Sequence, residues 1–156
     1  IPGEGGAYQM LGTSIRDPHG IEGAAGETTG LGLLDVETEM TPDKQLTQTD
    51  AQDALSGTSF SGYEIHIGRT EGPDCTRPFA HIGDRLDGAR SADGRIMGSY
   101  LHGMFRDDGF RAAMLATLGG SSSGVSYDQT VESTLDALAD HIETHLDVES
   151  MLQTAR

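Results

Sequence analysis

Two stretches of the chain combine residue types that could perform nucleophilic acyl chemistry. The first is GEGGAYQMLG, from Gly3 to Gly12, whose glycines favour a sharp turn between a strand and a helix. Enzymes use such a turn to hold a nucleophile in a strained backbone conformation. The position of the nucleophile is occupied by Gly5, which has no side chain. A backbone N–H just after the turn can stabilise an oxyanion, so Gly6 is a candidate donor.

The second stretch is SYLHGMF, from Ser99 to Phe105, in which His102 stands at the end of a predicted strand. A histidine at that place can act as a base toward the turn residue if the two strands are neighbours. Gly-rich turns and strand-end histidines are each common, and a histidine with satisfied hydrogen bonds is the plain alternative. Together, the two stretches predict a catalytic position at His102 that lacks its nucleophile.

Alternating apolar residues predict the strands that would position these groups. GLGLLDVETEM, from Gly30 to Met40, is expected to be a strand with Leu34, Val36 and Thr38 on one side. The polar segment 41–58 is expected to be irregular or to lie at an edge.

SFSGYEIHIGRTEG, from Ser59 to Gly72, predicts a half-buried strand with Tyr63 and Ile65 on its apolar side and Glu64 and His66 on its polar side. Function is expected on the polar side.

The remaining elements indicate an α/β layered domain. A helix is predicted over 108–118, and a second one begins at a capping box formed by Ser126 and Gln129. Apolar residues recur along this second helix at helical spacing, which favours core packing over docking to a partner. The predicted domain has a core over 1–118, with the Gly-rich turn at 3–12 and the histidine strand at 95–102, a Gly/Ser break over 119–125 and a C-terminal helix over 126–156.

Composition limits the partners. The 156 residues suit one domain, and 25 acidic residues against 10 basic ones give a net charge of -15. Such a surface repels phosphate backbones and anionic lipids, so neither nucleic acid nor a membrane is an expected partner. No long apolar run or targeting leader is evident, and Cys75 is the only cysteine, which together predict a cytoplasmic protein. The acidic balance is typical of a halophile, although a GC-rich genome would also suppress lysine.

Four blocks carry a resemblance to a known family. GEGGAYQMLG resembles the G-[I/V]-C-G-G-Y-Q-M-L-G turn of the cobyric acid synthase family, and GLGLLDVET, GYEIHIGRT and GSYLHGMF resemble its later blocks in the same order. The GYEIH block separates this family from the related cobyrinic acid a,c-diamide synthases. The resemblance implies a flavodoxin-like class I glutamine amidotransferase fold, incomplete at its N-terminus.

The resemblance also implies partners. In that family, glutamine is hydrolysed and the ammonia amidates adenosylcobyrinic acid a,c-diamide, the corrinoid substrate of an N-terminal synthetase domain that uses ATP and Mg. No cofactor is therefore expected in this chain, and the sequence contains no GxxxxGK[S/T] loop. A sheet without its first strands would expose an unpaired edge, which predicts self-association.

Carried over by position, the resemblance implies roles for three residues. His102 would be the general base, Gly6 an oxyanion donor, and Gln9 a residue near the substrate glutamine. Glu64 and His66 either line the ammonia site or belong to a solvated sheet face.

The chain departs from the family pattern at the turn. Gly5 aligns with the family cysteine and Ala7 with the third glycine, while Met104 stands where other class I amidotransferases have a glutamate and this family has none. Without a thiol, the chain is expected to be an inactive amidotransferase domain of cobyric acid synthase. The alternative is a catalytically dead binding or scaffolding module that docks a corrinoid synthetase partner.

A histidine pair and the cysteine are each expected to have no functional role. His141 and His145 lie one helical turn apart, but no third ligand is evident, so a solvated helix face is expected and no metal site is predicted. Cys75 is expected to be a surface thiol.

Overall fold

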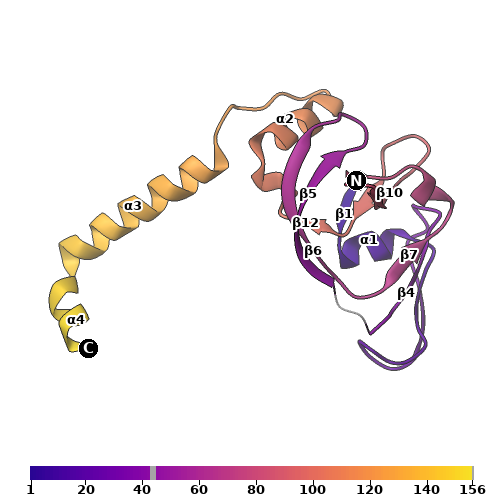
Figure 1. The fold of residues 1–156 in the computed structure, drawn as a ribbon, viewed down its shortest axis with the longest axis horizontal. Helices are drawn as coiled ribbons and strands as arrows, with labels where there is room; N and C mark the ends of the chain where they lie inside the picture. Colours follow the sequence, from indigo (N-terminus) through magenta and orange to yellow (C-terminus); the bar gives the residue numbers. More distant parts are fainter. Residues whose placement is uncertain (43–44, 156) are drawn as a thin grey trace.

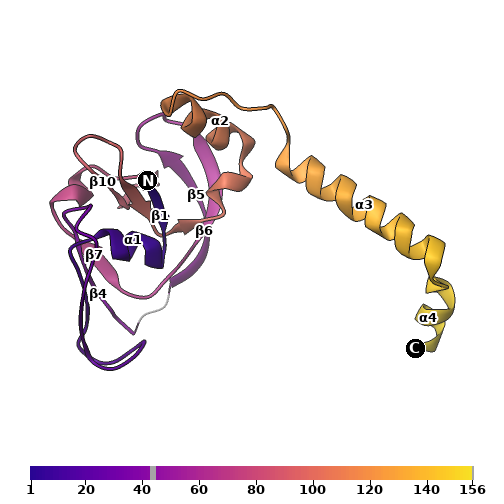
Figure 2. The ribbon, with the colours of Figure 1, turned by 180° about the vertical axis from the view of Figure 1, so that it is seen from behind.

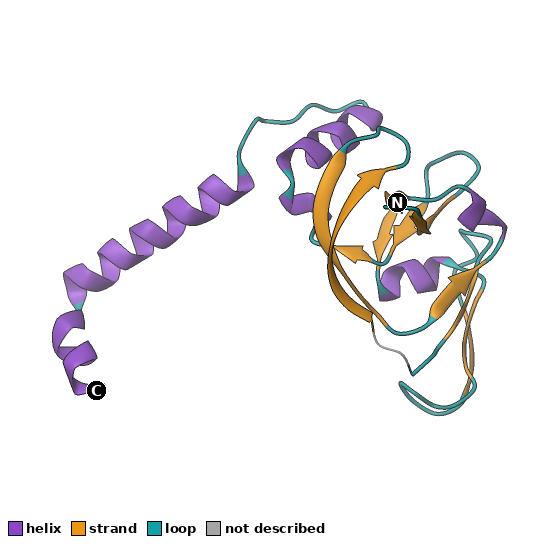
Figure 3. Cartoon of the chain, in the orientation of Figure 1, coloured by secondary structure: helices purple, strands orange, loops and turns teal. Residues whose placement is uncertain are grey.

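The computed structural model describes residues 1–42 and 45–155. Its β-rich part contains both chemistry-bearing stretches, and a long C-terminal helix extends away from it (Figure 1). The view from behind gives the same arrangement (Figure 2), and long loops connect many of the short strands (Figure 3). Among the described residues, no helix is both long enough and apolar enough to cross a membrane.

In the described residues, three sheets build the β-rich part. The first has the order β1-β11-β10, the second β12-β6-β5-β8-β9, and the third β3-β2-β4-β7. Parallel pairing joins β1 to β11 and β2 to β4. The strands are β1 (Pro2–Glu4), β2 (Ser14–Asp17), β3 (Gly26–Thr29), β4 (Glu37–Glu39), β5 (Gln45–Asp53), β6 (Ser59–His66), β7 (Arg69–Glu71), β8 (Ala80–Ile82), β9 (Arg85–Asp87), β10 (Ala89–Arg90), β11 (Met97–Ser99) and β12 (Leu101–His102).

Helices follow the turn and close the chain. The mixture of sheets and helices confirms the predicted α/β class. The helices are α1 (Gly6–Leu11), α2 (Asp108–Thr117), α3 (Tyr127–His145) and α4 (Val148–Thr154), with short 3₁₀ turns at Pro73–Thr76 and Met104–Arg106.

Two apolar clusters form the core. One joins the five-stranded sheet to α2 around Phe60, Phe79 and Phe110. The other packs α1 against the segment before β4, around Tyr8 and Leu34. The Gly-rich turn and the histidine strand therefore rest on packed elements.

Sequence alternation predicted one strand face correctly and missed one strand. Leu34, Val36 and Thr38 are buried as expected, although only Glu37–Glu39 is a strand. The expectation of an irregular or edge segment is wrong for β5, which pairs with β6 on one side and β8 on the other. Backbone pairing along nearly the whole of β6 stabilises this polar strand, so its side chains carry little apolar signal. Residues 43 and 44 of that segment lie outside the described part.

The predicted faces of β6 are reversed near its centre. Tyr63 is 45% exposed, whereas Glu64 is only 5% exposed. Glu64 is buried because both of its carboxylate oxygens accept hydrogen bonds from Arg85, at 2.8 and 2.6 Å. A satisfied ion pair therefore overrides the apolar pattern.

The C-terminal helix does not pack in the core. Helix α3 begins at the predicted cap, where the Ser126 side chain accepts from the Gln129 N–H. None of its residues is buried, however, and Leu135 is 53% exposed. The prediction of core packing is wrong, because helical spacing reports an apolar stripe and not what covers it.

Candidate functional site

The Gly-rich turn has the geometry that its sequence predicts. Strand β1 runs parallel to β11, with Glu4 opposite Ser99, and the Gly5 N–H donates to the Ser99 carbonyl at 2.9 Å. Gly5 then adopts φ 54° and ψ −120°, a conformation that side chains rarely adopt, and α1 begins at Gly6. The chain thus forms the strand, strained turn and helix of a nucleophile elbow.

His102 lies directly beside this turn. A Cβ atom placed on Gly5 would be 2.8 Å from His102 Nε2 and 2.9 Å from Cε1. The Nε2 atom is buried and has no hydrogen-bond partner among the described residues. The structure therefore brings the two predicted stretches together. Both distances are shorter than real Cβ contacts, so the imidazole would have to shift slightly to admit a side chain at position 5.

Glu4 contacts the other ring nitrogen, and the sequence-based prediction missed it. Its Oε2 atom is 3.6 Å from His102 Nδ1. Burial raises the pKa of the Glu4 carboxyl, and the attraction of His102 partly offsets that effect. The sequence does show an acidic residue immediately before Gly5. Its proximity to His102 is visible only in the folded structure.

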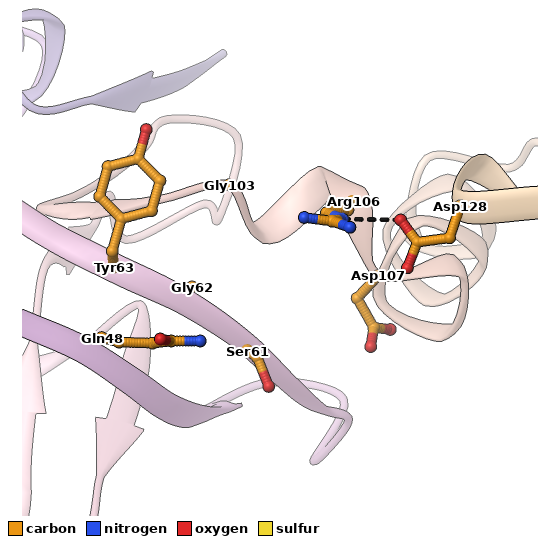
Figure 4. Close-up of a pocket in the computed structure, with 8 residues that line it drawn as sticks. All are labelled: Gln48, Ser61, Gly62, Tyr63, Gly103, Arg106, Asp107 and Asp128. Atoms are coloured by element: carbon orange, nitrogen blue, oxygen red, sulfur yellow. Dashed lines mark hydrogen bonds and ion pairs between the residues drawn. The ribbon is translucent and has the colours of Figure 1, made fainter. Parts of the chain in front are cut away.

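Tyr63 covers the imidazole from β6. The two rings stack with their centroids 5.5 Å apart and their planes 18° apart. Tyr63 also lines an open cavity of about 560 Å³, whose far side carries the exposed ion pair between Arg106 and Asp128 (Figure 4). The Tyr63 ring therefore stacks on the His102 imidazole, and Tyr63 also borders this cavity.

A second cavity lies on the α1 side of the turn. Gly6, Gln9 and His66 line this space of about 240 Å³, so three of the predicted site residues are brought together. Gly6 opens α1, and its N–H therefore has no acceptor within the helix. Its role as an oxyanion donor stays a prediction.

Gln9 and His66 are held by the fold around this cavity. The Gln9 side-chain amide donates to the Ile67 carbonyl at 2.9 Å and to the Tyr100 hydroxyl at 3.3 Å. His66 stacks on the Tyr100 ring with the centroids 3.8 Å apart, and its Nδ1 lies 3.1 Å from the Gly68 carbonyl. Contacts within the chain therefore hold both side chains in place without a ligand.

Glu64 does not line the cavity of Gly6, Gln9 and His66. Its carboxylate is occupied by Arg85, so it does not belong to a solvated sheet face. Contact with a substrate stays a prediction for Glu64, as it does for Gln9 and His66.

Cys75 is partly buried, and not the surface thiol that was expected. It packs against the Tyr8 cluster, with Sγ 3.9 Å from the Tyr8 hydroxyl. Burial raises the pKa of the Cys75 thiol. The thiol is therefore a weak nucleophile in this setting.

No group of three or more His, Cys, Asp and Glu side chains in the described ranges could hold a metal ion. On α3, the rings of His141 and His145 lie 4.3 Å apart, and the His145 ring nitrogen Nδ1 contacts the His141 carbonyl. Both residues are exposed.

Comparison with known proteins gives the family of this fold. The family model described as the CobB/CobQ-like glutamine amidotransferase domain matches residues 1–110. The cobyric acid synthase of Cereibacter sphaeroides is 62% identical over 151 residues, which cover 97% of this chain and 31% of that protein. The cobyric acid synthase of Rhodobacter capsulatus is 63% identical over 151 residues, with 97% and 31% coverage. That of Jannaschia is 63% identical over 147 residues, with 94% and 30% coverage.

The chain thus spans about a third of the length of the curated relatives that it matches. The family match covers the Gly-rich turn, the β6 block and His102. Residues of β6 help to line both cavities, and Gly6 and Gln9 line the smaller one. The chain belongs to the CobB/CobQ-like glutamine amidotransferase family.

Proposed function

We propose that this chain is the glutamine amidotransferase part of a cobyric acid synthase, and that Gly5 interrupts its hydrolytic step. The observation that carries the proposal is the position of His102 directly beside position 5, in a turn with φ 54° and ψ −120°. A Cβ at position 5 would be 2.8 Å from His102 Nε2, so the ring would shift slightly to admit a side chain there. The identity of more than 60% to cobyric acid synthases supports the same assignment.

In this proposal the thiol of a cysteine at position 5 would transfer its proton to His102 Nε2. The sulfur would attack the side-chain carboxamide carbon of glutamine, and the C–S bond would form while the carbonyl oxygen takes up negative charge. The Gly6 N–H would stabilise that charge. The C–N bond would then break, ammonia would leave with the proton from His102, and water would hydrolyse the thioester.

The native chain lacks the group that starts this sequence. His102 without a thiol should give little glutaminase activity, since members of such a pair act as a unit. We place the use of ATP and Mg, and the corrinoid substrate, in a synthetase part outside this chain. Ammonia would reach the corrinoid only through that partner.

Gly5→Cys tests the proposal. The variant should release ammonia from glutamine at least about a hundredfold faster than the native chain, because nucleophile and base would again act together. Gly5→Ala is the matched control, since it adds the same Cβ at the same strained φ, at a cost of about 1–3 kcal/mol, without a thiol. It should stay as inactive as the native chain.

A second candidate function follows from the missing side chain at Gly5. A module that keeps the fold without chemistry could dock a corrinoid synthetase partner as a scaffold. A folded Gly5→Cys variant that releases no ammonia, and that a glutamine-derived diazoketone does not label at position 5, would favour this scaffold.

A further inference from the structure

The imidazole of His102 lies between position 5 and an acidic side chain. On one side, the buried Nε2 is directed at Gly5 and has no partner in the described part of the chain. On the other side, Nδ1 is 3.6 Å from Glu4 Oε2. Position 5 and Glu4 are adjacent in one turn, so the ring lies between them.

A neutral imidazole has a proton on only one nitrogen, and the partner of the other nitrogen decides which one. Glu4 presents a carboxylate oxygen, which only accepts hydrogen bonds when ionised. A proton on Nδ1 would face this acceptor favourably, whereas a lone pair on Nδ1 would face another lone pair. The carboxylate therefore favours the form in which Nε2 carries the free lone pair.

We propose that Glu4 is a positioning residue that holds His102 with its proton on Nδ1, so that the basic Nε2 faces position 5. Other class I amidotransferases have a glutamate at the position of Met104, as the acidic partner of the catalytic histidine. In this chain, Glu4 would serve as that acidic partner. Met104 is buried in the apolar cluster around Phe110 and faces different neighbours. The catalytic meaning of this inference rests on the proposed function. The position of the proton on His102 can be tested whether or not the chain has that function.

The backbone around Glu4 is rigid enough for this role. Glu4 is paired with Ser99 in the β1–β11 ladder, and the next residue donates to the Ser99 carbonyl. His102 is paired with Tyr63 on β6, whose ring stacks on the imidazole. Because 3.6 Å is longer than a direct hydrogen bond, the proposal requires a small rotation of the carboxylate or one bridging water to complete the contact.

Nitrogen-15 NMR of the histidine side chains tests the inference in the native chain. The His102 signals are assigned by their loss in His102→Gln. At a pH where the ring is neutral, Nδ1 should have the chemical shift of a protonated nitrogen and Nε2 that of an unprotonated one. In Glu4→Ile the preference should fall at least fivefold, and the Nε2-protonated form should become populated.

Two controls separate this effect from a general disturbance. Glu37→Gln removes an exposed carboxylate from β4 and should leave the His102 signals unchanged. Tyr63→Phe keeps the stacked ring and should do the same. If Glu4→Ile does not fold, the near-isosteric Glu4→Gln replaces it and should also weaken the preference.

A second readout uses the thiol that Gly5→Cys introduces. Glu4 should stabilise the imidazolium that forms when the thiol loses its proton to Nε2, so removing the carboxylate lowers the thiolate fraction. Alkylation of this thiol by iodoacetamide, followed by peptide mass mapping to distinguish Cys75, should slow about fivefold in Gly5→Cys with Glu4→Gln. Ammonia release does not enter either readout, so a failure of the proposed function leaves them interpretable.

The inference is overturned if native His102 carries its proton on Nε2, or if Glu4→Ile and Glu4→Gln both leave the nitrogen shifts unchanged. An alkylation rate that is the same with and without the Glu4 carboxylate would also overturn it.

Discussion

At the scale of single residues, Asp87 and Ser99 link the core to the turn. The Ser99 hydroxyl donates to Asp87 Oδ2 at 2.5 Å and accepts from the Leu101 N–H at 2.9 Å, next to His102. The Ser99 carbonyl accepts the Gly5 N–H. One serine therefore ties a buried carboxylate to both halves of the candidate site.

Asp87 should make stability depend on pH. Burial raises the pKa of this carboxyl, while the Ser99 hydrogen bond partly offsets the rise. The folded state therefore binds the proton more tightly than the unfolded state, and stability falls as pH rises from the ordinary value through the raised one. Asp87→Asn, which keeps an acceptor for Ser99, should become more stable relative to the native chain between about pH 4 and pH 7 in urea unfolding.

Asp93 is exposed and serves as the control, because its pKa is shifted in the opposite direction to that of Asp87. Hydrogen bonds from Ser91 and from the Arg95 N–H lower the pKa of Asp93, so its ionised form favours folding. Relative to the native chain, Asp93→Asn should lose stability as pH rises from below the lowered pKa to just above the ordinary value of about 4, and should change little from about pH 5 to about pH 7. Parallel curves for the two variants would contradict the assignment of the raised pKa to Asp87.

At the scale of elements, the helix after the turn lies unusually close to the strand beneath it. A Cβ placed on Gly98 of β11 would be 2.0 Å from Cδ2 of Tyr8, the buried aromatic residue of α1. Because Tyr8 is packed in its cluster and cannot retreat, Gly98→Ala should lower the free energy of unfolding by about 1–3 kcal/mol. Gly23→Ala meets no atom within 4 Å and should be nearly neutral.

Chemical unfolding of both variants checks this packing. Equal losses for Gly98→Ala and Gly23→Ala would mean that Tyr8 can move aside, and that α1 is not fixed over β11.

The sequence predicted those parts of the fold that local patterns encode. Alternation indicated which side chains before and within β4 are buried. The approach of His102 to Gly5 is not a local pattern, and it was expected only on the condition that their two strands are neighbours. The pairing of Glu64 with Arg85 could not be read, since the two residues meet only when β6 and β9 join one sheet. Glu4 was missed for the same reason: its partner is distant in the chain.

At the scale of the whole molecule, apolar surface remains open despite a net charge of -15. The described strands leave β1 with one neighbour, β11, so its other edge is unpaired. Helix α3 extends away from the β-rich part (Figure 1). Its sequence carries an apolar stripe along one face. The stripe consists of Val131, Leu135, Leu138, Ile142 and Leu146, of which the last four are exposed.

This apolar stripe on α3 should drive self-association that salt strengthens. Salt screens the repulsion between acidic copies, so sedimentation velocity should show larger species in about 1 M KCl than in about 0.1 M KCl. Leu135→Gln with Ile142→Gln should reduce the association without lowering the unfolding midpoint, because neither side chain is buried. Ser133→Gln with Thr144→Gln, on the opposite face of α3, should associate as the native chain does. A native chain that stays monomeric at every concentration and salt level would contradict the prediction, and equal loss in both double variants would assign the association to something other than the stripe.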